Sequence, residues 1–411
     1  MVNADLNATP SANRIHIGFF GRRNSGKSSL INAFTGQEVS IVSAQAGTTT
    51  DPVTKPMEIK GLGPCVLIDT AGFDDVGVLG GQRIAKSRLT AQKADIAVIL
   101  ISVAYIARSS QPPDLSLEKE WADYLESQNC RVLWVLSQSD AVAPEVLPRL
   151  REVAANLLQA SPLCVSVKEK ESLEAFKAAL KASLAPTERR HILGNLVKPR
   201  DLVVLVMPQD IQAPQGRLIL PQVQTIRELL DRRCVAVATT ADDFSDTLKA
   251  LGRNPDLIVT DSQVFGKVYA AKPAEVPLTS FSVLFANYKG DLPYYLQGAD
   301  KLDELTEKDR ILIAECCSHA PLKEDIGREK LPRLLRKRLG EGIAIDIVSG
   351  QDFPEDLTPY SLIIQCGACM FNRNYVINRI KRAQDQGVPM SNYGVILAKL
   401  NGILDQIALN M

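Results

Sequence analysis

The chain has 411 residues, and its 47 Lys and Arg residues balance its 47 Asp and Glu residues, so the formal net charge is zero. With no global field of either sign, the sequence argues against nucleic acid and against anionic membranes as partners. Hydrophobic residues at 45% and charged residues at 23% are typical of a globular protein, and the length suits two or three domains.

Two features of the sequence indicate a cytoplasmic protein. The longest apolar run, residues 96–107, is too short to span a bilayer, which takes about 20 residues. Residues 1–14 lack the apolar core of a signal peptide. Because cytoplasmic thiols stay reduced, the eight cysteines argue against a disulfide framework. Four stand singly beside apolar stretches and are expected to be small core residues: Cys65, Cys130, Cys164 and Cys234.

Short apolar runs alternate with helical patterns along the chain, which predicts parallel α/β sheets. In the first unit the expected strands are residues 15–20, 66–68, 96–102 and 132–136, and the expected helices are 29–35, 117–127 and 145–159. In the second unit we expect strands at residues 202–207, 235–238 and 257–259 and a helix at 223–233. In the third unit we expect strands at residues 311–314, 344–348 and 362–364 and helices at 330–339 and 375–384. The second unit is short, so it could bury an edge or a face in a partner.

A phosphate-binding loop follows the first expected strand. Residues 21–28 match G-x-x-x-x-G-K-[ST] in full and lead into an expected helix, the context that supports the motif. In such a loop Lys27 reaches the β- and γ-phosphates and Ser28 holds Mg²⁺. The nucleotide-binding residues expected here are Gly21, Asn24, Ser25, Gly26, Lys27, Ser28 and Ser29. We therefore expect a P-loop GTPase domain followed by two smaller α/β domains with mainly parallel sheets.

Further nucleotide motifs follow in the order that a GTPase requires. Residues 47–51 form a polar loop in which Thr49 is expected to complete the Mg²⁺ shell. Asp69 and Gly72 delimit a D-x-x-G motif at a strand end, where Asp69 could hold Mg²⁺ through water and the Gly72 N–H could sense the γ-phosphate. The position after Gly72 is Phe73, which cannot orient a water molecule, so intrinsic hydrolysis should be slow without another device.

Recognition of the base depends on a modified motif. Where GTPases carry N-K-x-D, residues 137–140 read Ser-Gln-Ser-Asp. Asp140 keeps the carboxylate that would pair with the guanine N1–H and N2–H groups, whereas Ser137 and Gln138 replace the Asn and the Lys. We expect a preference for guanine to survive, with a weaker affinity for the nucleotide. Ser166 and Val167 are candidates for the last base-contact loop.

The loop G-x-x-N-x-G-K-S with its G-T-T-x-D switch resembles the TrmE/Era-type GTPases. In that family the loop asparagine, here Asn24, helps to hold a K⁺ ion that does the work of an arginine finger. The resemblance therefore implies K⁺-stimulated hydrolysis of GTP to GDP and phosphate, with Lys27, Asn24 and Thr49 as the catalytic residues.

Cysteines late in the chain predict a metal or iron–sulfur site. Cys317 follows one expected strand, and Cys366 and Cys369 form a C-x-x-C motif after another. Side chains at the carboxyl ends of parallel strands gather at one edge of the sheet, and thiolates select zinc or iron–sulfur clusters. The fourth ligand stays open among His319, Glu324 and Cys316, which are near in sequence. Adjacent cysteines in a strand diverge, so Cys316 is expected in the core.

A TrmE/Era-type GTPase followed by Cys-x-His and a distant C-x-x-C resembles the HydF family, the GTPases of [FeFe]-hydrogenase maturation. The likeness covers nearly the whole chain and includes residues 207–214, 216–222, 325–328, 352–357 and 391–394. The family usually has a histidine directly before the C-x-x-C, whereas this chain has Gln365, a poor iron ligand. This departure favours Glu324, slightly over His319, or an exchangeable external ligand at the fourth position. The resemblance implies a flexible tail at residues 1–12, a GTPase domain at 13–185, a dimerisation domain at 186–275 and an iron–sulfur domain at 276–411.

The same resemblance implies a carrier function. The protein would hold a [4Fe–4S] cluster with an exchangeable site and receive a diiron precursor with CO and CN⁻ ligands, made with two radical-SAM enzymes. It would deliver this unit to apo-[FeFe]-hydrogenase, with GTP hydrolysis switching partner affinity and the middle domain forming a homodimer. The alternative is a TrmE/Era-type GTPase of tRNA modification or ribosome assembly with a zinc-stabilised C-terminal domain. A structural adaptor with a merely stabilising nucleotide site is a third possibility.

Overall fold

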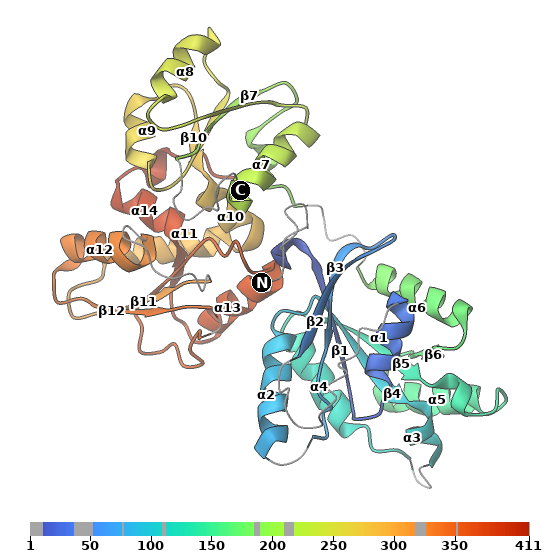
Figure 1. Ribbon diagram of the computed structural model, residues 1–411. Coiled ribbons are helices and arrows are strands. Elements are labelled where there is room, and N and C mark those ends of the chain that lie inside the picture. Colours follow the sequence, from blue (N-terminus) through green and yellow to red (C-terminus); the bar gives the residue numbers. More distant parts are fainter. Residues whose placement is uncertain are drawn as a thin grey trace. The chain divides into compact units, whose positions relative to one another are not determined.

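A computed structural model describes residues 11–36, 52–75, 78–108, 112–184, 190–208, 218–316, 326–350 and 352–410. The chain divides into two compact units, Met1–Thr187 and Glu188–Met411 (Figure 1). The first unit contains one sheet and the second contains two. Within the described ranges, no helix has the length and apolar character needed to cross a bilayer.

The first unit is a six-stranded sheet in the order β2-β3-β1-β4-β5-β6. Its strands are β1 (Ile15–Gly21), β2 (Val53–Ile59), β3 (Gly63–Asp69), β4 (Ile96–Ser102), β5 (Arg131–Ser137) and β6 (Leu163–Val165). The edge strand β2 pairs antiparallel with β3, and the other neighbours are parallel. The helices are α1 (Lys27–Thr35), α2 (Val78–Ala91), α3 (Val103–Arg108), α4 (Ser116–Ser127), α5 (Leu147–Leu158) and α6 (Lys170–Ser183).

Both faces of this first sheet are covered by packed side chains. Val98 of β4 lies in a cluster with Leu30 of α1 and Phe176 of α6. Its neighbour Ala97 lies in a different cluster, with Trp121 of α4. Successive residues of a strand point to opposite faces, so a strand that is covered on both sides must be apolar throughout. This explains why the central strands are continuous apolar runs in the sequence.

The second unit contains two parallel four-stranded sheets. The first of them has the order β10-β9-β7-β8, from β7 (Leu202–Val206), β8 (Val235–Thr239), β9 (Leu257–Thr260) and β10 (Leu278–Ser280). The other has the order β12-β11-β13-β14, from β11 (Arg310–Ala314), β12 (Ala344–Val348), β13 (Leu362–Gln365) and β14 (Met390–Asn392). The prediction of a GTPase domain followed by two smaller α/β domains is thereby confirmed, and both added sheets are wholly parallel.

One hydrophobic core joins the two sheets of the second unit. The cluster contains Val204 and Ile258 from one sheet together with Leu312 and Ile364 from the other, and Tyr295 lies in it as well. The helices of this unit are α7 (Leu220–Asp231), α8 (Phe244–Leu251), α9 (Phe265–Ala271), α10 (Phe281–Lys289), α11 (Leu292–Asp300), α12 (Leu331–Leu339), α13 (Arg373–Asp385) and α14 (Tyr393–Leu400). Because the core is shared, these two sheets form a single compact body.

Several elements escaped the sequence analysis because they carry little pattern. Strands β10 and β14 have three residues each, Leu-Thr-Ser and Met-Ser-Asn, too few to show an alternation. Strand β2 alternates exposed and half-buried residues and contains Pro56, as an edge strand can. The domain limits given above remain predictions. The second sheet extends to Ser280, and Pro273 and Pro277 lie before its last strand.

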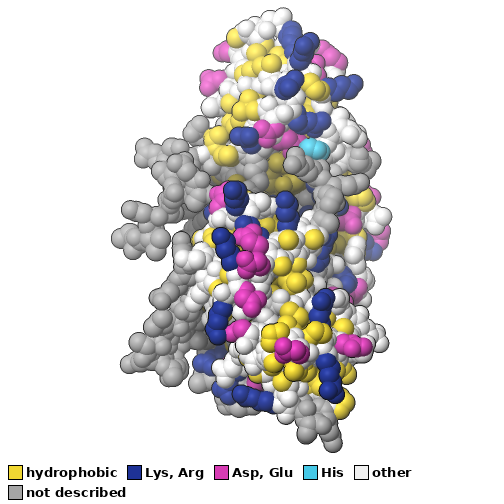
Figure 2. Space-filling model, turned by 90° about the vertical axis from the view of Figure 1, so that its right-hand side faces the viewer, with side chains coloured by type: hydrophobic (Ala, Val, Ile, Leu, Met, Phe, Trp, Pro, Cys, Tyr) yellow, Lys and Arg dark blue, Asp and Glu magenta, His cyan; other side chains and the backbone are white. Residues whose placement is uncertain are grey.

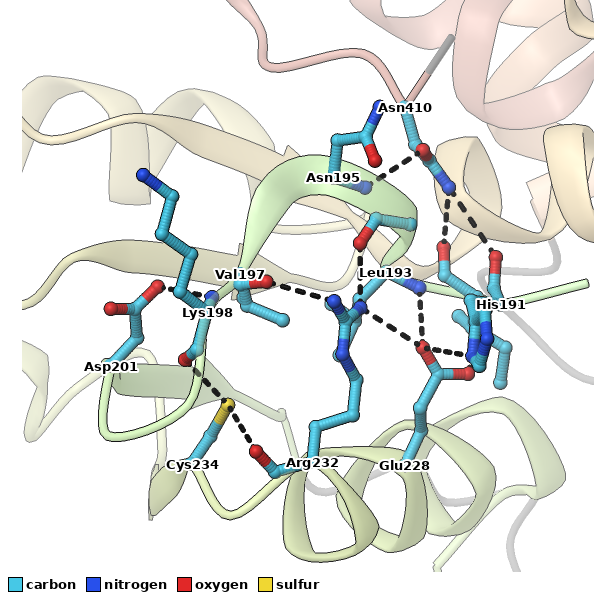
Figure 3. Close-up of polar contacts among 12 residues, drawn as sticks. His191, Leu193, Asn195, Val197, Lys198, Asp201, Glu228, Arg232, Cys234 and Asn410 are labelled. Atoms are coloured by element: carbon cyan, nitrogen blue, oxygen red, sulfur yellow. Dashed lines mark hydrogen bonds and ion pairs between the residues drawn. The ribbon is translucent and has the colours of Figure 1, made fainter.

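Polar contacts anchor the start of the second unit to α7 and to the C-terminal end of the chain (Figure 3). The Glu228 carboxylate accepts hydrogen bonds from the backbone N–H groups of Ile192 and Leu193, at 2.7 and 3.0 Å. Arg232 donates to the carbonyls of Gly194 and Val197, at 2.6 and 2.9 Å. The Asn410 amide donates to the carbonyls of His191 and Ile192, at 3.4 and 3.2 Å. The first and last residues of this unit are thus tied together.

Replacing Glu228 with alanine is expected to destabilise the second unit. Two backbone N–H groups in a buried segment would lose their acceptor, at a cost of about 2–4 kcal/mol. Urea-induced unfolding of the full chain, followed by circular dichroism, measures the effect. Asp231→Ala on the same helix is the matched control, because Asp231 is exposed and pairs with Arg227 one turn away, a contact that contributes about 0.3–0.5 kcal/mol. Equal unfolding midpoints for the two variants would contradict the prediction.

Charged side chains of both signs are intermixed on the face of the molecule drawn in Figure 2. Lys and Arg lie among Asp and Glu and between apolar side chains, without a broad patch of one sign on that face. This distribution agrees with the zero net charge of the sequence.

Candidate nucleotide site and cysteine site

The phosphate loop connects β1 to α1 in the first unit. Gly21 and Gly26 have φ angles of 146° and 89°, in the region that favours glycine. A Cβ atom at Gly21 would lie 2.5 Å from the carbonyl oxygen of Leu100, so no side chain fits there. Helix α1 begins at Lys27, and the unpaired N–H groups of its first turn lie at the loop. Such a helix start is suited to binding phosphate.

Lys27 is held inside the loop by two carbonyl groups. Its Nζ donates to the oxygens of Gly21 and Arg22, at 3.0 and 2.9 Å. Burial lowers the pKa of Lys27, and the charges of Asp69, Asp74 and Asp75 oppose that effect. The ammonium group is therefore positioned at the place where a phosphate chain lies in a P-loop.

Ser28 and Asp69 lie together at the start of α1 and the end of β3. The Ser28 hydroxyl donates to Asp69 Oδ2 at 2.5 Å, and Asp69 Oδ1 is buried without a hydrogen-bond partner among the described residues. Burial raises the pKa of Asp69, while the Ser28 hydrogen bond and Lys27 oppose it. A hydroxyl next to an unsatisfied carboxylate oxygen fits a hard cation such as Mg²⁺.

A cavity of about 530 Å³ opens over this loop. Of the predicted nucleotide residues, those that line it are Asn24, Gly26, Lys27, Ser28, Ser29, Asp69 and Gly72. Gly21 and Ser25 belong to the loop but do not line the cavity; Ser25 is buried, and its carbonyl accepts from the Ser137 hydroxyl at 2.6 Å. The predicted switch residue Thr49 lies outside the described residues.

Two lining residues were not identified from the sequence. Arg83 and Ser87 lie one turn apart on α2 and line the cavity. Arg83 pairs with Asp75 at 3.4 Å, and the Ser87 hydroxyl is buried without a partner among the described residues. Their spacing of four residues puts them on one face of a helix, but sequence analysis had not predicted that helix.

Phe73 is part of the hydrophobic core and not of the cavity wall. It is buried, and its ring stacks on Trp121 with centroids 4.6 Å apart and planes inclined by 12°. Phe20 lies on the same cluster, with a centroid 6.4 Å from that of Phe73. This packing explains why the position after the D-x-x-G motif carries an aromatic residue instead of a polar one.

The candidate base-binding end is built from two loops. Asp140 accepts a hydrogen bond from the Ser166 hydroxyl at 2.9 Å and pairs with Lys168 at 2.6 Å. These hydrogen bonds, first that of Lys168 and then that of Ser166, lower the pKa of Asp140. The carboxylate of the modified motif thus lies beside the loop that begins at Ser166, and the roles of Asp140 and this loop in base contact stay predictions. Lys168 was not anticipated.

Gln138 occupies the position of the usual lysine and bridges two elements. Its side-chain carbonyl accepts from the Ser102 hydroxyl at 2.6 Å, and its amide donates to the Asn24 carbonyl at 3.2 Å. Gln138 also lines the cavity. It therefore connects the end of β4 to the phosphate loop without a positive charge.

The cysteine site lies in the third sheet, at the point where its strand order reverses. From β11 the chain crosses to β12 on one side and then returns to β13 on the other. In parallel sheets, ligands bind outside the carboxyl ends of the strands at such a point. Ala314 of β11 pairs with Gln365 of β13, so Cys366 directly after β13 and Cys316 two residues after β11 lie at the ends of neighbouring strands. Cys316 and the C-x-x-C motif thus lie at the same edge of the sheet, whereas the expectation that Cys317 joins them there stays a prediction because Cys317 is outside the described residues.

Hydrogen bonds around Cys366 favour its thiolate. The Cys316 N–H donates to Cys366 Sγ at 3.0 Å. The pKa of Cys366 is lowered, chiefly by a hydrogen bond with the Cys316 side chain, against the effect of burial and of Cys369. Ala368 has a φ of 50°, which turns the chain between the two cysteines. A turned C-x-x-C loop with a stabilised thiolate fits a zinc ion or an iron–sulfur cluster.

The structure does not test the rest of the predicted ligand set. Cys317, His319 and Glu324 fall outside the described residues, within which there is no cluster of three or more potential metal ligands. Cys316 is buried in the core, as predicted. Gln365 is also buried, and its amide donates to the Tyr295 hydroxyl at 3.4 Å, so it packs towards α11.

Comparisons with known proteins give similarities to parts of the chain. The tRNA modification GTPase MnmE of Chlorobium chlorochromatii is 32% identical over 178 residues, which is 43% of this chain and 36% of that protein. The GTPase Der of Wolinella succinogenes is 32% identical over 152 residues, 36% of this chain and 30% of that protein. The chain thus spans about a third of the length of these two relatives.

Solved structures give weaker similarities. A crystal structure of an Aquifex aeolicus Era variant bound to GDP and aluminium fluoride is 17% identical, with a TM-score of 0.36; the match covers 55% of this chain and 92% of that one. The FeoB G-domain of Methanococcus jannaschii is 19% identical, with a TM-score of 0.30, covering 42% of this chain and 99% of that one. Scores this low add nothing to the argument.

Family models match most of the first sheet and the whole of the other two sheets. Residues 16–138 match the model described as a 50S ribosome-binding GTPase. Residues 192–290 match the hydrogen maturase F dimerization domain, and residues 293–410 match the hydrogen maturase F tetramerization domain. The last two matches together cover more than half of the chain and imply a homo-oligomer. A GTPase domain followed by these two domains shows that the chain belongs to the hydrogen maturase F (HydF) family.

Proposed function

We propose that this protein is a GTP-switched carrier of an iron–sulfur unit in the maturation of [FeFe]-hydrogenase. In this proposal Cys317, Cys366 and Cys369 hold a [4Fe–4S] cluster, with Glu324 or His319 as the fourth ligand or an exchangeable external one. The cargo is a diiron precursor with CO and CN⁻ ligands, supplied by two radical-SAM enzymes and delivered to the apo-hydrogenase. The observation that carries the proposal is the position of Cys366 beside Cys316 at the reversal point of the third sheet.

The experiment that tests this function is anaerobic purification with iron, sulfide and zinc analysis, followed by a hydrogenase activation assay. About four irons and four sulfides per chain, together with activation of an apo-hydrogenase, would support the carrier. Stoichiometric zinc without iron would favour the alternative, a GTPase of tRNA modification or ribosome assembly with a zinc-stabilised C-terminal domain. The similarity to tRNA modification GTPases concerns part of the chain only, whereas the hydrogen maturase F models cover the rest.

For the nucleotide site we propose GTP hydrolysis assisted by K⁺. Asn24 lies in the phosphate loop with a φ of 62°, is exposed and lines the cavity that contains Lys27 and Ser28. Its side-chain oxygen is therefore available to a cation at the phosphates. Lys27, Ser28 and Thr49 would act on the phosphates and on Mg²⁺, and Asp140 on the base.

Hydrolysis is expected to be at least about tenfold faster in potassium than in sodium chloride, because a cation in place of an arginine finger stabilises the charge of the transition state. Asn24→Ala should remove most of this difference. Phosphate release at saturating GTP and equal ionic strength measures it, and nucleotide binding to the variant serves as the control. Equal rates of the wild-type protein in both salts would refute the role of K⁺.

We propose that α7 and the edge strand β8 form a surface for a second copy of this chain. In the described part of its sheet β8 is the outermost strand, so one side of its backbone has no neighbouring strand there. Four large apolar side chains on or beside these two elements are well exposed: Leu218, Val223, Leu230 and Val235. Leu230 and Val235 are exposed by 59% and 52%.

Leu230→Glu is expected to shift the protein towards smaller species. A buried leucine contributes about 1.5–3 kcal/mol, and an unpaired carboxylate in an interface adds a further penalty. Size-exclusion chromatography with light scattering, over a range of concentrations, measures the molar mass. Leu89→Glu, at an exposed leucine of α2 in the first unit, is the control. If both variants kept the wild-type mass, the interface would have to lie elsewhere.

A further inference from the structure

Two buried cations lie beside the cysteine site. Lys289 is the last residue of α10, and Arg379 lies in the middle of α13; each side chain belongs to a residue that is 3% exposed. A buried charge is costly unless opposite charges or hydrogen bonds stabilise it. Among the described residues, neither one forms an ion pair with a carboxylate. The groups that would carry a negative charge near Lys289 in this part of the chain are the thiolates of Cys369, Cys316 and Cys366.

Lys289 holds the loop that carries the C-x-x-C motif. Its Nζ donates three hydrogen bonds, which is the full capacity of an ammonium group. The acceptors are the carbonyl oxygens of Ala368 at 3.1 Å, Cys369 at 3.3 Å and Phe371 at 2.8 Å. Three donated hydrogen bonds require the protonated ammonium form of the side chain. The lysine comes from the region that matches the dimerization domain, whereas the loop comes from the next one.

Arg379 places a second charge next to Cys316. Its Nη1 donates to Cys316 Sγ at 3.5 Å, and its Nη2 donates to the Gly350 carbonyl at 2.6 Å. Three aromatic rings surround the guanidinium, those of Phe353 at 4.6 Å, Tyr375 at 4.9 Å and Phe371 at 5.5 Å from Cζ. Cation–π contacts stabilise a buried guanidinium but leave its charge uncompensated. The positive charges of Lys289 and Arg379 therefore act on the sulfur atoms of the cysteine site.

We propose that Lys289 and Arg379 are fixed counter-charges for an anionic, thiolate-bound metal centre, and that Lys289 is also a positioning residue for the loop with Cys366 and Cys369. The inference rests on the proposed function, since the anion is the cluster with its thiolates. Reduction adds one electron to such a centre. Cations held in a buried site stabilise the reduced form more than the oxidised form, and they thus raise the reduction potential.

The first test is the reduction potential of the cluster in the full-length protein. Lys289→Met and Arg379→Met keep most of the side-chain volume and remove the charge. Each variant is expected to show a more negative midpoint potential in an EPR-monitored titration. Lys272→Met is the matched control, because Lys272 also donates to two carbonyls, those of Pro273 and Ala274 between α9 and β10. Potentials equal to that of the wild-type protein in both variants would overturn the counter-charge role.

The positioning role is tested without any cluster. Hydrogen exchange of the apo protein should become faster at residues 366–372 in Lys289→Met but not in Lys272→Met, with thermal unfolding as the check on folding. Unchanged exchange would overturn this role. If the wild-type protein bound no iron, the proposed function would fail by itself. The counter-charge role would then be tested by titration with Co²⁺. The Lys289→Met and Arg379→Met variants should bind Co²⁺ about 10- to 100-fold more weakly than the wild-type protein. Equal affinities for Co²⁺ would overturn the inference.

Discussion

Cys366→Ala is expected to reduce the iron bound by the anaerobically purified protein to background. Cys366 follows β13 at the reversal point of the sheet, accepts the Cys316 N–H at 3.0 Å and has a lowered pKa. These hydrogen bonds favour the thiolate form of Cys366, which is the form that binds a metal. A cluster with few protein ligands becomes labile when one of them is removed. Iron and sulfide analysis, with EPR of the reduced protein, measures the loss.

The matched control for this variant is Cys164→Ala. Cys164 is a half-buried cysteine in β6 of the first unit, and burial raises the pKa of its thiol. Its removal should leave the iron content and the EPR signal unchanged. Retention of the cluster in Cys366→Ala would place the metal centre elsewhere, and a loss of zinc instead of iron would favour a structural metal site.

Lys27→Ala is expected to lower GTP hydrolysis by at least about 10²–10³-fold. The Lys27 ammonium is buried and held at the mouth of the loop by the carbonyls of Gly21 and Arg22. Because this charge is already positioned for the transferred phosphoryl group, no free energy is spent on reorganising it during the reaction. Removing one such donor raises the activation free energy by about 3–4 kcal/mol. Phosphate release at saturating GTP measures the rate, and a fluorescent GTP analogue measures binding.

Lys177→Ala is the control for this prediction. Lys177 lies on α6 in the same unit, and its contact with Glu174 is long, at 4.0 Å, so its removal should leave both rate and binding unchanged. A Lys27→Ala variant with more than a tenth of the wild-type rate would contradict the assigned role. Iron binding in the second unit should not respond to Lys27→Ala, which separates the two sites.

Local signals in the sequence determined much of this protein. The eight residues of the phosphate loop predict a strand, a glycine turn and a helix start together, because each is a property of neighbouring residues. Continuous apolar runs predict the central strands, and β4 and β12 have the predicted bounds, Ile96–Ser102 and Ala344–Val348. The C-x-x-C motif, which follows one such run, predicts a metal site at a strand end.

Only the tertiary structure decided which distant residues meet. Gln138 bridges Ser102 and Asn24 because β4, β5 and the phosphate loop are adjacent in space. Lys289 reaches the cysteine loop at a sequence separation of about 80 residues, through the core shared by two sheets. A single lysine at a helix end has no pattern that distinguishes it from a surface residue. Its burial depends on the packing of whole elements, and a local sequence window contains no information about that packing.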